Sequence, residues 1–142
     1  MPVQQHEFLQ AKSTWPDLEI VSTNRWGEIL AVRGSMEGIL GGTNFTIAKR
    51  KIRYGFYVNV SNIRSSMIPD FWILSPPANS ILHVNIFAPN YCPDLNSYLP
   101  SLCWGENKLR WKNLEIPKRT LFALLIMAKD VLNNQNFESR TR

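Results

Sequence analysis

The chain of 142 residues has few of the side chains that build disulfide frameworks or metal centres. It holds two cysteines, Cys92 and Cys103, and two histidines, His6 and His83, which lie far apart in the sequence. Two cysteines without a paired pattern do not make a disulfide scaffold, and the whole set is too small for a zinc site. We therefore expect reduced thiols and no metal.

A secretory leader and long apolar runs are missing as well. Residues 1–10 carry no apolar segment of the signal-peptide type. The longest apolar run, residues 121–127, is far shorter than the roughly 20 residues of a membrane-spanning helix. The net charge of +5 is mild, and no glycine-rich phosphate loop precedes a lysine and a serine or threonine. These features predict a cytoplasmic protein with no cofactor and no nucleic-acid or membrane partner.

The hydrophobic content of 44% is enough for a core, and the length suits a single domain over residues 1–142. Apolar spacing predicts a short helix over residues 4–13. Runs rich in β-branched and aromatic residues predict strands. These strands are expected at residues 18–21, 28–33, 45–51, 52–60 and 71–74. The order predicts an α+β fold with an antiparallel sheet.

Two segments are predicted to be loops, and one long helix is expected after them. Residues 34–44 hold four of the seven glycines, and residues 89–100 hold three prolines. A proline is well placed in a first helical turn, so Pro117 is expected to open the last helix. Its apolar face continues at helical spacing to Leu132, and Asn133 is expected to end it.

Cys103 stands between apolar residues and a turn-like segment, with Trp111 eight positions later. A thiolate can accept an acyl group from another thioester and then pass it to an amine. Lys108 and Arg110 follow closely, and nearby positive charge favours the reactive thiolate. The alternative is a buried cysteine that packs as a small hydrophobic side chain.

These features, taken together with the triplet His83-Val84-Asn85 and the helix after Pro117, resemble the ubiquitin-conjugating enzymes over about residues 45–135. The resemblance implies an N-terminal helix, a four-stranded antiparallel meander, an active-site loop and a long helix. On this resemblance, the family's C-terminal helices are expected to be truncated. The short form is similar to bacterial members found in ubiquitin-like conjugation operons and in antiphage (CBASS) operons beside cGAS-like nucleotidyltransferases.

The resemblance also implies roles for three residues. Cys103 would be the catalytic nucleophile, and Asn85 would stabilise the oxyanion formed during attack on the thioester. His83 would be a structural residue, and the alternative is that it acts as a catalytic base. The implied partners are a donor protein with a conjugatable C-terminus, which is a ubiquitin-like protein or a cGAS-like nucleotidyltransferase, and a target protein. An activating enzyme is a further partner that some such systems use.

Two departures from the family pattern keep alternatives open. The middle residue of the triplet is Val84 rather than proline, and the eighteen positions from Asn85 to Cys103 exceed the usual spacing. Cys92, seven positions after Asn85, is therefore a rival nucleophile. The altered triplet and the longer spacing also suit a non-catalytic interaction module on the same fold. An unrelated thiol hydrolase ranks last, because only His83 is available as its base.

Overall fold

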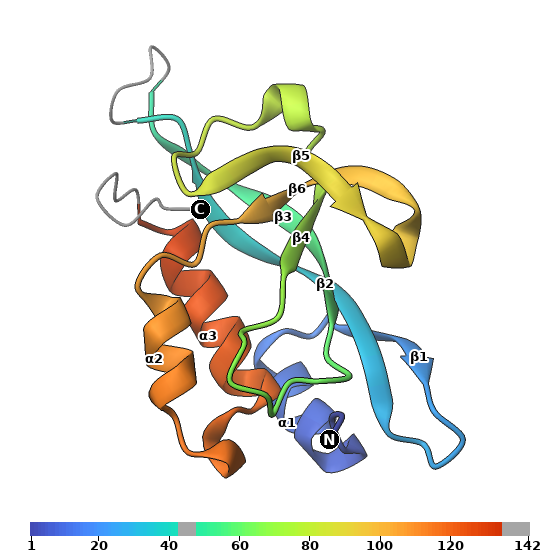
Figure 1. The fold of residues 1–142 in the computed structure, drawn as a ribbon. Helices are drawn as coiled ribbons and strands as arrows, with labels where there is room; N and C mark the ends of the chain where they lie inside the picture. The colour runs from blue at the N-terminus through green and yellow to red at the C-terminus, as the bar shows by residue number, and fades with distance from the viewer. Residues whose placement is uncertain (43–47, 135–142) are drawn as a thin grey trace.

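The computed structural model describes residues 1–42 and 48–134, in which helices pack against an antiparallel sheet. The sheet has six strands in the order β1-β2-β3-β4-β6-β5 (Figure 1). Its strands are β1 (Glu19–Thr23), β2 (Ile29–Leu40), β3 (Arg50–Asn59), β4 (Phe71–Ser75), β5 (Ile86–Cys92) and β6 (Ser97–Leu102). The α-helices are α1 (Gln5–Thr14), α2 (Asn107–Asn113) and α3 (Leu121–Leu132). The α+β class and the N-terminal helix are confirmed.

Strands β1 to β4 follow one another as an antiparallel meander. The loop predicted over residues 34–44 is wrong for residues 34–40, which belong to β2. Strand β2 runs on to Leu40 and pairs with β3 down to Leu40↔Arg50. Gly38 lies within this strand, and the position suits glycine because a Cβ there would come within 2.8 Å of the Leu132 Cβ and 2.9 Å of the Tyr54 ring. This glycine therefore serves close packing rather than a turn. Residues 43–47 lie outside the described residues, and they include the first three positions of the strand expected at residues 45–51.

The predicted loop at residues 89–100 is also wrong, because this segment forms the hairpin of β5 and β6. The register shifts between Phe87 and Asn90, which accommodates Pro89 on an edge strand. Pro93 begins a short 3₁₀ turn, η2 (Pro93–Leu95), and Asn96 follows with a left-handed φ of 46°. The hairpin joins the meander where Trp72 pairs with Ser101. The sheet thus has two strands where an active-site loop was expected.

The last helix begins four residues later than expected. Pro117 lies in a separate 3₁₀ turn, η3 (Ile116–Lys118), and Thr120 caps α3 by accepting a hydrogen bond from the Ala123 N–H at 3.1 Å. Asn133 ends the helix, as expected. Across residues 1–42 and 48–134, no helix combines the length and the apolar character needed to cross a bilayer.

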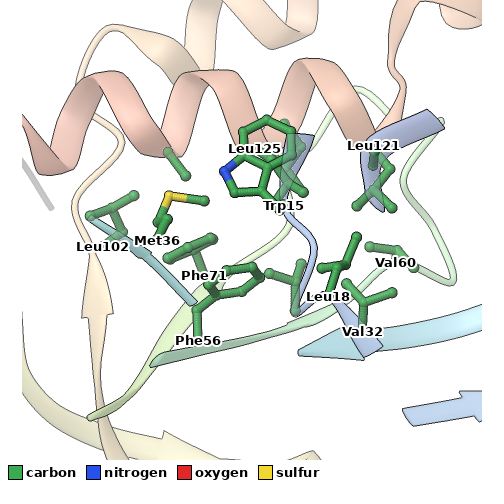
Figure 2. Packing of buried hydrophobic residues seen from close by; sticks show 14 of the residues in the cluster. Trp15, Leu18, Val32, Met36, Phe56, Val60, Phe71, Leu102, Leu121 and Leu125 are labelled. Atoms are coloured by element: carbon green, nitrogen blue, oxygen red, sulfur yellow. The ribbon is translucent and has the colours of Figure 1, made fainter. Parts of the chain in front are cut away.

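The core lies between the helices and one face of the sheet (Figure 2). Leu121 and Leu125 of α3 are fully buried against it. Phe56 and Phe71 stack with ring centroids 4.7 Å apart on the strands beneath. Each fully buried leucine side chain contributes roughly 1.5–3 kcal/mol from burial alone. This packing fixes the position of α3, whose C-terminal end forms one wall of the site described below.

A largely buried ion pair joins α1 to the segment after β3, and its carboxylate also contacts the start of α3. The Arg64 guanidinium contacts both carboxylate oxygens of Glu7, and the same carboxylate accepts the Leu121 N–H at 2.7 Å. Arg119 and Arg64 each donate to the other's backbone carbonyl, at 2.7 and 2.6 Å. Arg119 also donates to the Trp111 carbonyl at 3.2 Å. The network therefore ties α1, the segment after β3, and the junction of α2 with α3.

Candidate functional site

The last residue of the β5–β6 hairpin lies beside its first residue, and this brings the flanking residues Asn85 and Cys103 together. Asn85 immediately precedes β5, and Cys103 immediately follows β6. Ile86 pairs with Leu102, and beyond that pair the Cys103 N–H donates to the Asn85 carbonyl at 2.8 Å. The eighteen positions that separate the two residues are therefore taken up by the hairpin.

His83 fastens the same segment to the end of α3. One ring nitrogen, Nε2, lies 2.9 Å from the Leu132 carbonyl, and Nδ1 accepts the Asn85 N–H at 3.1 Å. A carbonyl only accepts and a backbone N–H only donates, so the ring is the neutral tautomer with the proton on Nε2. Burial lowers the pKa of His83 below its usual range, and the bond to Leu132 opposes this in part. With both nitrogens engaged, His83 is placed to orient the segment rather than to transfer a proton.

Asn85 is buried, and its side chain is only half satisfied. Its amide nitrogen donates to the Asn134 carbonyl at 2.8 Å, just beyond the end of α3. Its side-chain oxygen is buried and has no hydrogen-bond partner in the described part of the chain. Buried polar atoms are nearly always hydrogen-bonded, so such an atom calls for an explanation.

Asn85 and Cys103 line one small pocket of about 130 Å³. We call it the thiol pocket, and Cys103 lines it together with the polar residues Asn85, Glu106, Asn107, Arg110, Asp130 and Asn134. Roughly 10–15 Å³ of such space admits one water molecule, so the pocket is about ten times larger than that minimum. Cys103 itself is only 3% exposed. Arg110 lines the same pocket, whereas Lys108 lines a different hollow.

Two tryptophans support the site from the core side. The Trp111 side chain is fully buried, and its indole N–H donates to the Ser65 carbonyl at 3.2 Å. The Trp104 indole N–H donates to the Pro69 carbonyl at 2.9 Å. Both bonds hold the segment after β3 against the start of α2, which carries part of the pocket wall. Trp111 therefore acts in packing rather than in contact with a ligand.

The rival Cys92 lies at the other end of the hairpin and away from the thiol pocket. It is fully buried in a second apolar cluster that includes Tyr57, Trp72 and Leu99. The turn η2 is held over this cluster because Asp94 accepts hydrogen bonds from the Tyr57 hydroxyl at 2.8 Å and the Asn59 amide at 2.7 Å. The geometry thus pairs Asn85 with Cys103, and Cys92 packs as a small apolar side chain. Neither cysteine forms a disulfide.

Sequence reasoning did not single out the acidic part of the thiol pocket. Asp130 and Asn134 lie one turn apart at the end of α3, and the Asn134 amide donates to the Asp130 carboxylate at 3.1 Å. A polar pair four residues apart at the end of an otherwise apolar helix was the available signal. Glu106 comes from the turn before α2. Charged and amide side chains therefore line the thiol pocket.

Nowhere in residues 1–42 and 48–134 do three or more His, Cys, Asp or Glu side chains gather as a group able to hold a metal ion. A comparison of the chain with protein-family models, with curated proteins and with solved structures found no match in any of the three.

Proposed function

We propose that the protein is an acyl-carrier transferase of the ubiquitin-conjugating type, with Cys103 as its nucleophile. The observation that carries the proposal is the convergence of Asn85 and Cys103 on one pocket, joined by a backbone hydrogen bond of 2.8 Å. The meander of β1 to β4 followed by the hairpin and α3 suits a UBC-like layout. On this proposal the hairpin is an insertion between the triplet and the cysteine.

The chemistry has two exchange steps. The Cys103 thiolate attacks the carbonyl carbon of a donor C-terminus held as a thioester on another carrier. A new S–C bond forms, the bond to the carrier's sulfur breaks, and the carrier's thiolate leaves. An amine of the target then attacks the same carbon, the C–N bond forms, the Cys103 S–C bond breaks, and the amine proton passes to solvent. A thiolate is a good nucleophile and a good leaving group, so one side chain serves both steps.

Asn85 would stabilise the oxyanion in each step. Its amide nitrogen carries two hydrogens, and the bond to Asn134 uses one of them. An amide N–H aimed at the developing negative charge typically contributes about 10²–10³-fold in rate. His83 would hold the triplet against α3, which fixes where that amide points. The donor would be a protein with a conjugatable C-terminus, either a ubiquitin-like protein or a cGAS-like nucleotidyltransferase in antiphage defence. In systems that include an activating enzyme, that enzyme would supply the donor as a thioester.

A second candidate function is a non-catalytic interaction module on the same fold. The observation that favours it is the 3% exposure of Cys103, since a nucleophile needs access to its substrate. The thiol hydrolase has less support, because both nitrogens of His83 are already hydrogen-bonded. The transferase requires the thiol pocket to widen when the donor binds, whereas the module does not.

Thiol labelling and adduct formation separate the two candidates. The protein is co-expressed with the proteins encoded beside it, and the mixture is run on a gel with and without reducing agent. The transferase predicts an adduct that reductant removes, that Cys103→Ala abolishes and that the matched variant Cys92→Ala retains. Absence of any adduct, together with a Cys103 that iodoacetamide does not label at neutral pH, would leave the module as the better account.

A further inference from the structure

A second, larger hollow of about 770 Å³ lies between the segment after β3 and helix α2. We call it the loop–helix groove, and the residues that matter below are Asn62, Ser66, Met67, Asp70, Lys108 and Lys112. Trp104 lines both this groove and the thiol pocket. Its hydrogen bond to Pro69 fixes the groove wall to the residue next to Cys103. A molecule in the groove therefore lies beside the candidate site.

The groove combines apolar and polar surface in a way that suits a peptide. Met67 lines the groove and is 79% exposed, so its apolar side chain is accessible to a partner. A methionine is flexible and polarisable, so it adapts to different apolar partners. Asn62 and Ser66 are short side chains that can both donate to and accept from a peptide backbone. Such a lining binds an extended chain through its backbone and one apolar side chain.

The two lysines define the charge that the groove favours. Lys108 and Lys112 are exposed and four residues apart in α2, so they lie on one face about 6 Å apart along the helix. Alternate residues of an extended peptide project to the same side, about 6.6–6.8 Å apart. Two carboxylates at positions i and i+2 of such a peptide therefore match the two ammonium groups. Asp70 also lines the groove and would repel a third carboxylate.

We propose that the loop–helix groove binds an extended acidic segment of a partner protein. The segment carries acidic side chains at two alternate positions, which pair with Lys108 and Lys112, and an apolar side chain that contacts Met67. The binding needs no thioester chemistry, so it holds equally for the transferase and for the interaction module. It is therefore expected in a Cys103→Ala protein.

The test uses the full chain carrying Cys103→Ala and a displayed library of random dodecapeptides. Enriched peptides are expected to contain two acidic residues separated by one residue, with an apolar residue near them. The best peptide is then synthesised with a fluorescent label, and its affinity is measured by polarisation. We expect Lys108→Glu combined with Lys112→Glu to weaken binding at least tenfold, and Met67→Ser to weaken it severalfold. Affinity should also fall as salt is raised, because exposed ion pairs are screened.

The matched control is Lys49→Glu combined with Lys51→Glu, two exposed lysines away from the groove lining. This control makes the same change in net charge and should alter the affinity less than twofold. A control that weakens binding as much as the groove variant would show general charge attraction and overturn the proposal. Enrichment of peptides without paired acidic residues, or no enrichment at all, would overturn it too. Thermal melting of each variant checks that the fold is kept.

Discussion

The buried ion pair between Glu7 and Arg64 gives the most quantitative prediction for stability. The two side chains are 7% and 18% exposed, and the Glu7 carboxylate also accepts the Leu121 N–H at the start of α3. Glu7→Gln keeps an oxygen for Leu121 but removes the charge, which leaves the Arg64 guanidinium buried without its counter-charge. Breaking a buried pair in this way costs about 3–5 kcal/mol. We lower the expectation to about 2–4 kcal/mol because the hydrogen bond to Leu121 persists and Arg64 is partly solvated.

Equilibrium unfolding in urea measures this loss. With a slope of about 2 kcal/mol per molar, the middle of the range for a small domain, the midpoint should fall by roughly 1–2 M without a change in slope. Glu19→Gln is the matched control, because Glu19 forms its ion pair with Arg33 where both side chains are about 60% exposed. An exposed pair contributes about 0–1 kcal/mol, so this control should barely move the midpoint.

A double-mutant cycle decides whether the ion pair itself is responsible. Adding Arg64→Gln to Glu7→Gln removes the unpaired charge, so the double variant should lose less than the sum of the two single variants by about 1–3 kcal/mol. The reasoning is refuted if the two losses add to within about 0.5 kcal/mol. It also fails if Glu7→Gln costs no more than Glu19→Gln.

Three further outcomes follow from the structure. Burial lowers the pKa of His83, so the unfolded chain binds a proton at this residue at a higher pH than the folded chain does. The stability that neutral His83 contributes is therefore complete above about pH 6.5 and is lost as the pH falls below it, with a slope of up to about 1.4 kcal/mol per pH unit. The free energy of unfolding should differ less between pH 7.5 and 5.5 in His83→Gln than in the wild type, and an equal difference would contradict this. Gly38→Ala should destabilise by about 1–3 kcal/mol in thermal unfolding, because the new Cβ meets Leu132 and Tyr54 at under 3 Å, and an unchanged melting temperature would show that α3 can shift. Burial and, after it, the hydrogen bond to Asp94 raise the pKa of Tyr57, so Asp94→Ala should lower that pKa in part. The same substitution should speed the labelling of Cys92 by a thiol reagent, and an unchanged labelling rate would mean that η2 does not cover that thiol.

The elements that the sequence predicted well are those whose pattern comes from a single dominant cause. The apolar spacing of α3 and the aromatic, β-branched run of β3 directly reflect the faces they bury. The apolar pattern of α1 is a poorer guide, because this helix buries Glu7 with Phe8 and leaves Leu9 62% exposed. The misplaced start of α3 has a local reason. Pro117 fits a first helical turn, but the side chain of Thr120 provides the cap, and a cap sets the boundary more strongly than a preceding proline.

The wrong loops arose where glycine or proline had a tertiary purpose. Gly38 lies in mid-strand because Leu132 and Tyr54 pack against its backbone, which no local pattern reveals. Pro89 and Pro93 sit at a register shift and at a hairpin turn, where strands tolerate proline. Cys103 and Asn85 could be named from their spacing and resemblance, but their proximity depends on the hairpin. The orphaned side-chain oxygen of Asn85 and the contact with Asn134 depend on where α3 ends, and only the folded chain shows this.

The most direct test of the central proposal is to locate the bond between the protein and its donor. The adduct formed on co-expression is purified from the wild type and from Cys103→Ser, digested, and sequenced by mass spectrometry. A carrier role predicts a reductant-sensitive thioester at Cys103 in the wild type, and in Cys103→Ser a reductant-resistant ester at the same position. A bond at Cys92, or a Cys103→Ala protein that still forms the adduct, would contradict it.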